Sequence, residues 1–301
     1  MTLPPEHPAP PSHRRAEAEA LAAPLSPLLA AAMDLSQSVG LGTHGRRRAG
    51  PGADFWQYRA LENGEAAGAI DWRRSARGPS LYVREREWTV SQTVWLWRDG
   101  SESMRWRSRL DLPTKLERAS LLLLSLAVLL NRGGERFGWL GQPSLPVGGD
   151  MAHVTRLTAA LDLQLGENAP EHAPTHGGAM VLMSDFLHPI EQWRERLERW
   201  RNLRLRGHLL HLLDPAEETF PYQGRVQFHG VEGEPTITLS RCESLRTAYQ
   251  QKLQAHRDAL ASLARHQGWS VSTHTTADPP RTILAHLAQT IAQDRRDKMS
   301  R

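Results

Sequence analysis

From about residue 91 onward, short apolar runs alternate with longer amphipathic segments. A short apolar run bounded by turn residues is typical of a strand buried on both faces, whereas a longer segment with a repeat of 3.6 residues is typical of a helix. The pattern predicts strands over 92–98, 136–141, 179–184, 207–213 and 269–275, and helices over 114–131, 151–163, 189–205, 243–267 and 281–294.

The order of these segments predicts the fold class. Strands separated by helices favour βαβ units, and therefore an α/β fold with a doubly wound, mostly parallel sheet. The first helix has a capping box, Thr114 with Glu117, and ends at Gly133-Gly134. Near residues 219–240, two short β-like segments flank a glycine-rich turn and predict an inserted hairpin.

The chain before the first predicted strand has a different character. Residues 1–35 are rich in proline and alanine, and we expect them to be partly disordered. Residues 36–90 are rich in arginine and glycine and carry short tryptophan- and tyrosine-bearing stretches, which predict a β-containing N-terminal subdomain. Residues 91–301 then form the α/β domain with its inserted hairpin.

Composition narrows the cellular setting. The net charge of +4 permits an anionic partner without requiring one. Cys242 is the single cysteine, which excludes an internal disulfide and fits a reducing compartment. The longest apolar run, 119–130, is shorter than the roughly 20 residues of a membrane span, and the N-terminus has no apolar signal-peptide core. These features predict a cytoplasmic protein.

Oxygen-bearing side chains follow the predicted strands. Asp99, Ser101 and Ser103 alternate directly after 92–98, Asp185 follows the third strand and Asp214 follows the fourth. The carboxyl ends of parallel strands share one edge of a sheet, where ligands bind. Such oxygens suit a hard cation such as Mg²⁺, although the same residues are also common in turns and helix caps.

These residues and a segment upstream carry a resemblance to known families. Asp99-x-Ser101-x-Ser103, with a later strand that ends in Ser184-Asp185, resembles the metal-ion-dependent adhesion site of von Willebrand factor A domains. The ordered series Gly50 to Phe55, Tyr58-Arg59, Asn63 to Glu65, Ile70 to Arg77 and Leu81 to Glu85 resembles the signature of the bacterial domain-of-unknown-function 58 family. The resemblance covers about residues 36–295.

The resemblance implies a ligand set and shows where this chain departs from it. Asp99, Ser101, Ser103 and Asp185 would be the metal ligands, with Mg²⁺ as the candidate cofactor. The threonine of a complete adhesion site has no clear match; Asp150 lies at about its place as a weaker candidate, and Thr155 comes next. Arg98 stands where an apolar residue is usual. A degenerate adhesion site is therefore expected.

The function implied by the resemblance is that of a non-enzymatic interaction module. Its partners would be a MoxR-type AAA+ ATPase and client proteins, in chaperone-like assembly or activation. Two alternatives stay open. One is a Mg²⁺-dependent hydrolase that uses Asp99, Asp185 and Asp214, which the lack of a clustered histidine or lysine disfavours. The other is an RNA-binding protein that uses the arginine-rich subdomain, where interspersed acidic residues favour ion pairs instead and nucleic acid is not expected.

Two further groups are interpreted as structural. His208 and His211 fall on opposite faces of one predicted strand, and His172 and His176 lie in a loop; neither pair has zinc-site spacing. The Ile70–Arg77 stretch is interpreted as a clamp that packs the subdomain onto the sheet, with an Asp71–Arg77 ion pair as one form of it.

Overall fold

The structure is a computed structural model, which describes residues 26–39, 55–60, 70–76, 78, 80–86, 93–140, 145–162, 178–203, 205–231 and 233–299. Several predictions fall outside these ranges: disorder in 1–25, the roles of His172 and His176, and Arg77 as the partner of Asp71. The stretches 46–54 and 63–65 also lie outside them.

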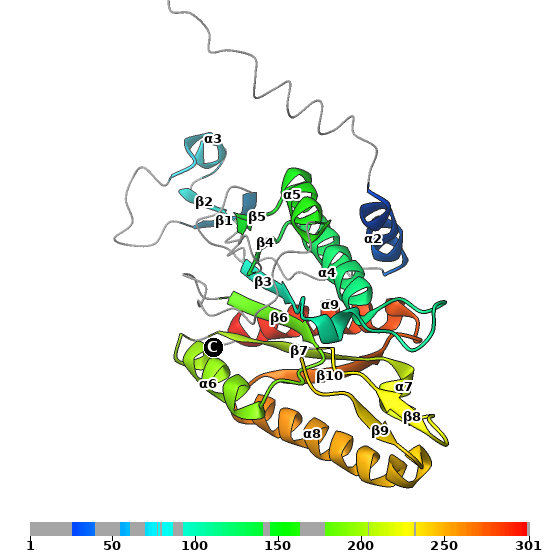
Figure 1. The fold of residues 1–301 in the computed structure, drawn as a ribbon. Helices are drawn as coiled ribbons and strands as arrows, with labels where there is room; N and C mark the ends of the chain where they lie inside the picture. The colour runs from blue at the N-terminus through cyan, green and yellow to red at the C-terminus, as the bar shows by residue number, and fades with distance from the viewer. Residues whose placement is uncertain are drawn as a thin grey trace, which may run out of the picture.

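A six-stranded sheet forms the centre of the molecule (Figure 1). Its strand order is β10-β7-β6-β3-β4-β5, and every neighbouring pair is parallel except β4–β5. The strands are β3 (Thr93–Arg98), β4 (Arg136–Trp139), β5 (Leu145–Gly148), β6 (Gly178–Ser184), β7 (Arg206–Leu213) and β10 (Ser270–Thr275). The predicted α/β fold with a mostly parallel, doubly wound sheet is confirmed.

Helices cover both faces of the sheet (Figure 1). One apolar core lies between the sheet and α2 (Pro27–Ser38), α4 (Lys115–Arg132), α5 (Met151–Asp162) and α9 (Pro280–Met299). The second lies under α6 (Ile190–Asn202) and α8 (Arg246–His266), and is rich in tryptophan. The side chains of β3 alternate between them, with Val94 and Leu96 in the first core and Trp95 and Trp97 in the second.

The centre of α4 is apolar on all sides because the helix is enclosed on all sides. It contacts β3, β4, α2, α5 and α9. The predicted capping box is present, since Thr114 Oγ1 accepts from Glu117 N and Glu117 Oε2 accepts from Thr114 N. Gly133 caps the other end and Gly134 adopts a φ of 70°, as the sequence predicts.

The inserted hairpin is also confirmed. Strands β8 (Val226–Phe228) and β9 (Ile237–Leu239) pair in an antiparallel sheet of their own. Three short elements flank the strands of the domain: η2 (Glu102–Arg105), α7 (Pro215–Thr219) and η3 (Cys242–Leu245). The predicted strand histidines do point to opposite faces, since the His208 ring contacts His286 of α9 and the His211 ring contacts His256 of α8.

The structure differs from the sequence prediction at three places. Helix α2 begins within segment 1–35, which was expected to be partly disordered, and it is ordered because Ser26 caps it and its buried Leu29 and Ala32 pack into the first core. Strand β5 was not predicted, since it has four residues, contains Pro146 and is only partly buried. Helix α7, with five residues, is too short to show a helical repeat.

The subdomain holds an antiparallel pair, β1 (Phe55–Ala60) and β2 (Tyr82–Arg86), and the short helix α3 (Trp72–Ser75). Asp71 caps α3, because its Oδ1 accepts from Arg74 N at 2.9 Å. Ser75 Oγ accepts from Tyr82 N at 2.9 Å and so attaches α3 to β2. The signature stretch therefore has a local structural role in the subdomain.

Candidate functional site

The candidate site lies where the sheet changes its direction of growth. From β3, the chain continues to β4 on one side, whereas β6 lies on the other side. In open parallel sheets, ligands bind at the carboxyl ends of the strands at this switch point. Asp99 follows β3 and Asp185 follows β6, so the topology itself brings these two carboxylates to one edge.

Asp99 is buried, and hydrogen bonds hold both of its oxygens. Its Oδ1 accepts from Ser101 N at 2.9 Å and its Oδ2 accepts from Ser184 Oγ at 2.6 Å. Its backbone N–H donates to Met183 O at 2.8 Å, which joins the ends of β3 and β6. Burial raises the pKa of Asp99, while the hydrogen bonds from Ser184 and Ser101 lower it by less.

A chain of hydroxyl contacts connects the loop after β3 to Asp185. Ser101 Oγ and Ser103 Oγ lie 3.1 Å apart, and Ser103 Oγ donates to Asp185 Oδ2 at 2.8 Å. The structure thus brings together Asp99, Ser101, Ser103 and Asp185, the four residues that the sequence analysis predicted to lie at one site. Ser184 joins them through its bond to Asp99.

A tight turn fixes Asp185 in place. Phe186 has a φ of 51°, a left-handed conformation that is rare for a bulky residue and costs about 1–2 kcal/mol. Its N–H donates to Ser184 Oγ at 2.9 Å, and its buried ring packs edge-on against Trp193 with centroids 4.8 Å apart. The packing of this ring compensates for the strained backbone and holds the preceding carboxylate at the sheet edge.

Lys115 is a site residue that the sequence did not point to. Its position beside Asp185 corrects the expectation that no lysine is clustered with these acids, so that argument against a hydrolase does not hold. Its side chain is fully buried, and its Nζ donates to Asp185 Oδ2 at 2.9 Å and to Glu217 Oε1 at 2.5 Å. Burial would lower the pKa of Lys115, but the carboxylates of Asp185 and Glu217 raise it above its ordinary value, so the ammonium stays charged. A lysine at the first position of a helix, where the helix dipole disfavours a cation, is the signal that could have drawn attention to it.

Asp214 lies at the same edge but has a capping role. Its Oδ1 accepts from Ala216 N at 2.8 Å and its Oδ2 accepts from Ser108 N at 3.0 Å. Glu217 completes this capping box, since its Oε2 accepts from Asp214 N. Both oxygens of Asp214 are therefore engaged by backbone donors, which disfavours the hydrolase alternative because that alternative needs Asp214 as a ligand or base.

Asp150 and Thr155 are not part of this cluster. Strand β5 runs antiparallel to its neighbours, so it ends at the opposite edge of the sheet. Asp150 begins α5 there, and its Oδ1 accepts from His153 N at 2.7 Å. Thr155 Oγ1 donates within α5 to Met151 O. The missing adhesion-site threonine thus has no replacement in these two residues.

Arg98 shows why a charged residue can precede Asp99. It is 1% exposed, and its Nη2 donates to Leu161 O at 3.2 Å in the last turn of α5. A cation at a helix C-terminus is favourable to the helix dipole. Burial, and to a lesser degree Arg105, lower the pKa of Arg98 to about 10, so it remains charged at neutral pH.

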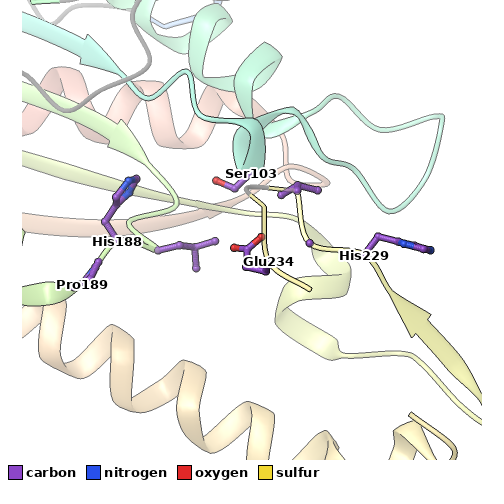
Figure 2. Close-up of a pocket in the computed structure, with 8 residues that line it drawn as sticks. Ser103, His188, Pro189, His229 and Glu234 are labelled. Carbon is purple, nitrogen blue, oxygen red and sulfur yellow. The ribbon is translucent and has the colours of Figure 1, made fainter. Parts of the chain in front are cut away.

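A cavity of about 360 Å³ opens beside the site (Figure 2). Ser103 of the site lines it, and two loops form its walls. One wall is the β6–α6 loop, and the other is the turn between β8 and β9. The lining residues beyond Ser103 are Leu187, His188, Pro189, His229, Gly230, Val231 and Glu234.

A doubly wound sheet with an Asp-x-Ser-x-Ser loop at its switch point defines an α/β protein of the von Willebrand factor A type. The family model described as "Protein of unknown function DUF58" matches residues 57–259. The chain belongs to this family, in agreement with the resemblance found in its sequence.

Other bacterial proteins are similar to this chain. The chain is 26% identical over 274 residues to the uncharacterized protein Rv1480 of Mycobacterium tuberculosis, covering 83% of this chain and 82% of the relative. An aerotolerance-related membrane protein from Bacteroides fragilis matches with a TM-score of 0.42 at 16% identity, covering 67% of this chain and 99% of that one. BatB from Bacteroides thetaiotaomicron matches with a TM-score of 0.40 at 13% identity, and the match again covers 67% of this chain and 99% of that one. In the part of the chain that the structure describes, no helix is both long and apolar enough to span a membrane.

Proposed function

We propose that this protein is a non-enzymatic interaction module that receives a protein partner at the carboxyl-end rim of its sheet. The rim consists of the loop after β3, the β6–α6 loop and the turn between β8 and β9. The observation that carries this proposal is the cavity beside Ser103, together with the apolar side chains exposed around it. Leu187 and Val231 line the cavity, and they are 57% and 46% exposed.

A third exposed apolar residue belongs to another loop that is joined to the carboxyl-end edge of the sheet. Leu110, in the loop after η2, is 87% exposed, and this loop is attached to the rim because Ser108 N donates to Asp214 Oδ2. Apolar side chains grouped around a hollow at a switch point are typical of a binding surface. The carboxylates beneath it are engaged in hydrogen bonds and an ion pair, so they support the geometry of the rim in preference to acid–base chemistry.

The partner we propose is a MoxR-type AAA+ ATPase, with which the module would assemble or activate client proteins in the cytoplasm. Support for this partner comes from membership of the family, and the energy of ATP hydrolysis would be supplied by the partner. The rim supplies a hollow lined by both apolar and polar side chains for such a protein, and the module itself would position the client.

Charge introduced into the hollow tests this proposal. We expect Leu187→Asp combined with Val231→Asp to weaken capture of the purified ATPase by about tenfold or more, since a buried carboxylate is costly in an apolar contact. Leu203→Asp is the matched control, because Leu203 is 51% exposed but follows α6 at the opposite edge. Titration on immobilised full-length protein measures both. Equal affinity of the double variant and the control would overturn the rim as the docking surface.

A further inference from the structure

Lys115 lies where the resemblance to adhesion sites would place a metal ion. Its ammonium contacts Asp185 Oδ2 at 2.9 Å, and Ser103 Oγ donates to the same oxygen at 2.8 Å. The cation thus adjoins two of the four nominated metal ligands. Neither the Lys115 nor the Asp185 side chain is more than 1% exposed, so this charge pair is secluded from water.

The arrangement does not fit Mg²⁺. Magnesium binds carboxylate oxygens at about 2.0–2.1 Å, so an ion on Asp185 Oδ2 would share that oxygen with the Lys115 ammonium. Two cations at one buried oxygen repel each other strongly, and an ammonium displaced from Asp185 would lose one of its two buried carboxylate partners. Within the described ranges, no three or more His, Cys, Asp or Glu side chains are grouped in a way that could hold a metal ion.

The anchoring of Lys115 makes its withdrawal costly. It occupies the first turn of α4, whose cap is fixed by Thr114 and Glu117, and whose body is enclosed by the first core. The second carboxylate, Glu217, comes from α7 at the end of β7, so the ammonium joins α4, the β6 turn and α7. Three elements would have to move apart before a hydrated metal ion could enter.

We propose that the Lys115 ammonium is a built-in replacement for the divalent ion of an adhesion site, so that the rim is assembled without metal. The carboxylate and hydroxyl groups of a divalent site are retained near it, since a chain of hydrogen bonds runs from Asp99 through Ser101 and Ser103 to Asp185. Removal of the ammonium would therefore leave an acidic, oxygen-lined space that suits a hard divalent cation.

Manganese binding to the full-length protein tests this proposal, with Mn²⁺ followed by electron paramagnetic resonance. We expect no saturable Mn²⁺ binding by the wild type, and saturable binding of one ion by Lys115→Ala with a Kd at least about tenfold below the highest Mn²⁺ concentration tested on the wild type. The added substitution Asp185→Ala should abolish the gain. Lys252→Ala, which removes a lysine from the exposed face of α8, is the matched control and should behave as the wild type.

The outcomes separate clearly. Saturable Mn²⁺ binding by the wild type that Asp185→Ala removes would overturn the proposal, and so would a folded Lys115→Ala variant that binds no ion. If the alanine variant does not fold, Lys115→Gln, which keeps a long polar side chain and removes the charge, provides the same comparison. If the proposed function also holds, EDTA should not affect capture of the partner. Mn²⁺ binding is measured without a partner, so the proposal about Lys115 and the proposed function can fail separately.

Discussion

At the scale of single residues, the site is defined by which charged side chains pair with one another and how deeply each pair is buried. Asp185 is paired with a fully buried ammonium, whereas the neighbouring Glu218–Arg257 pair lies at the surface, with side chains 42% and 23% exposed. Burial decides what each pair contributes, because a buried charge that loses its partner cannot be rescued by water. Exposed pairs contribute little.

The two pairs give a direct comparison of stability. We expect Asp185→Asn to lower the free energy of unfolding by about 3–5 kcal/mol, since Lys115 is left with a diminished counter-charge in the interior. Glu218→Gln, the control, should cost under about 1 kcal/mol. Urea denaturation of the two variants measures the difference, and a loss for Asp185→Asn no larger than that of the control would contradict the role of the buried pair.

At the scale of elements, helix ends shape the site. The Thr114 capping box fixes the start of α4 and thereby the position of Lys115, while the Asp214 capping box fixes α7 and thereby Glu217. Both boxes bring a functional side chain to the rim as the direct result of local backbone chemistry. The positions of Lys115 and Glu217 therefore depend on the capped starts of α4 and α7.

Loss of the first cap should be measurable. We expect Thr114→Ala to cost about 1 kcal/mol of unfolding free energy, because Glu117 N loses its acceptor. Thr155→Ala is the control. Thr155 lies in the middle of α5 with its side chain exposed to solvent, and alanine has the higher helix propensity, so this change should be neutral or slightly stabilising. Thermal unfolding followed by circular dichroism tests both. Similar losses for the two variants would argue against the capping contribution.

Elements also show what the sequence could and could not predict. Strands β3, β6 and β7 can be predicted from their apolar runs, because they are buried on both faces. The capping box at Thr114 can be predicted because it lies within four consecutive residues. The site acids were found because strand ends share an edge. Lys115 and Glu217 were not, since Lys115 contacts Asp185 across 70 residues of chain and Glu217 across 102, and no local pattern records such contacts.

At the scale of the whole molecule, buried histidines make stability depend on pH. Burial lowers the pKa of His208, His211 and His274 to about 4 in the folded protein, with smaller contributions from nearby cations such as Arg257 beside His211 and Arg118 beside His274. Each ordinary histidine pKa is about 6.5 when the chain is unfolded. The unfolded state therefore binds more protons below pH 6.5, and acid favours unfolding.

We expect the free energy of unfolding to be highest, for these groups, above pH 6.5 and to fall as the pH drops towards 4. Each fully shifted histidine contributes on the order of 3 kcal/mol across that window. His211→Leu should show a shallower fall than the wild type, because one of the three protonation sites is gone. Urea titrations at pH 7, 6, 5 and 4 measure both slopes, and identical slopes would show that His211 does not titrate on unfolding.

Tryptophans of the second core lie close enough to the rim for their fluorescence to respond to changes there. Phe186, the residue after Asp185, rests against Trp193, which in turn lies 6.0 Å from Trp97 between ring centroids. A shift of the rim turn would therefore change the surroundings of the Trp193 indole. Intrinsic fluorescence is thus coupled to the rim by covalent neighbours and ring packing alone, so the protein carries an optical reporter of its own docking surface without an added label.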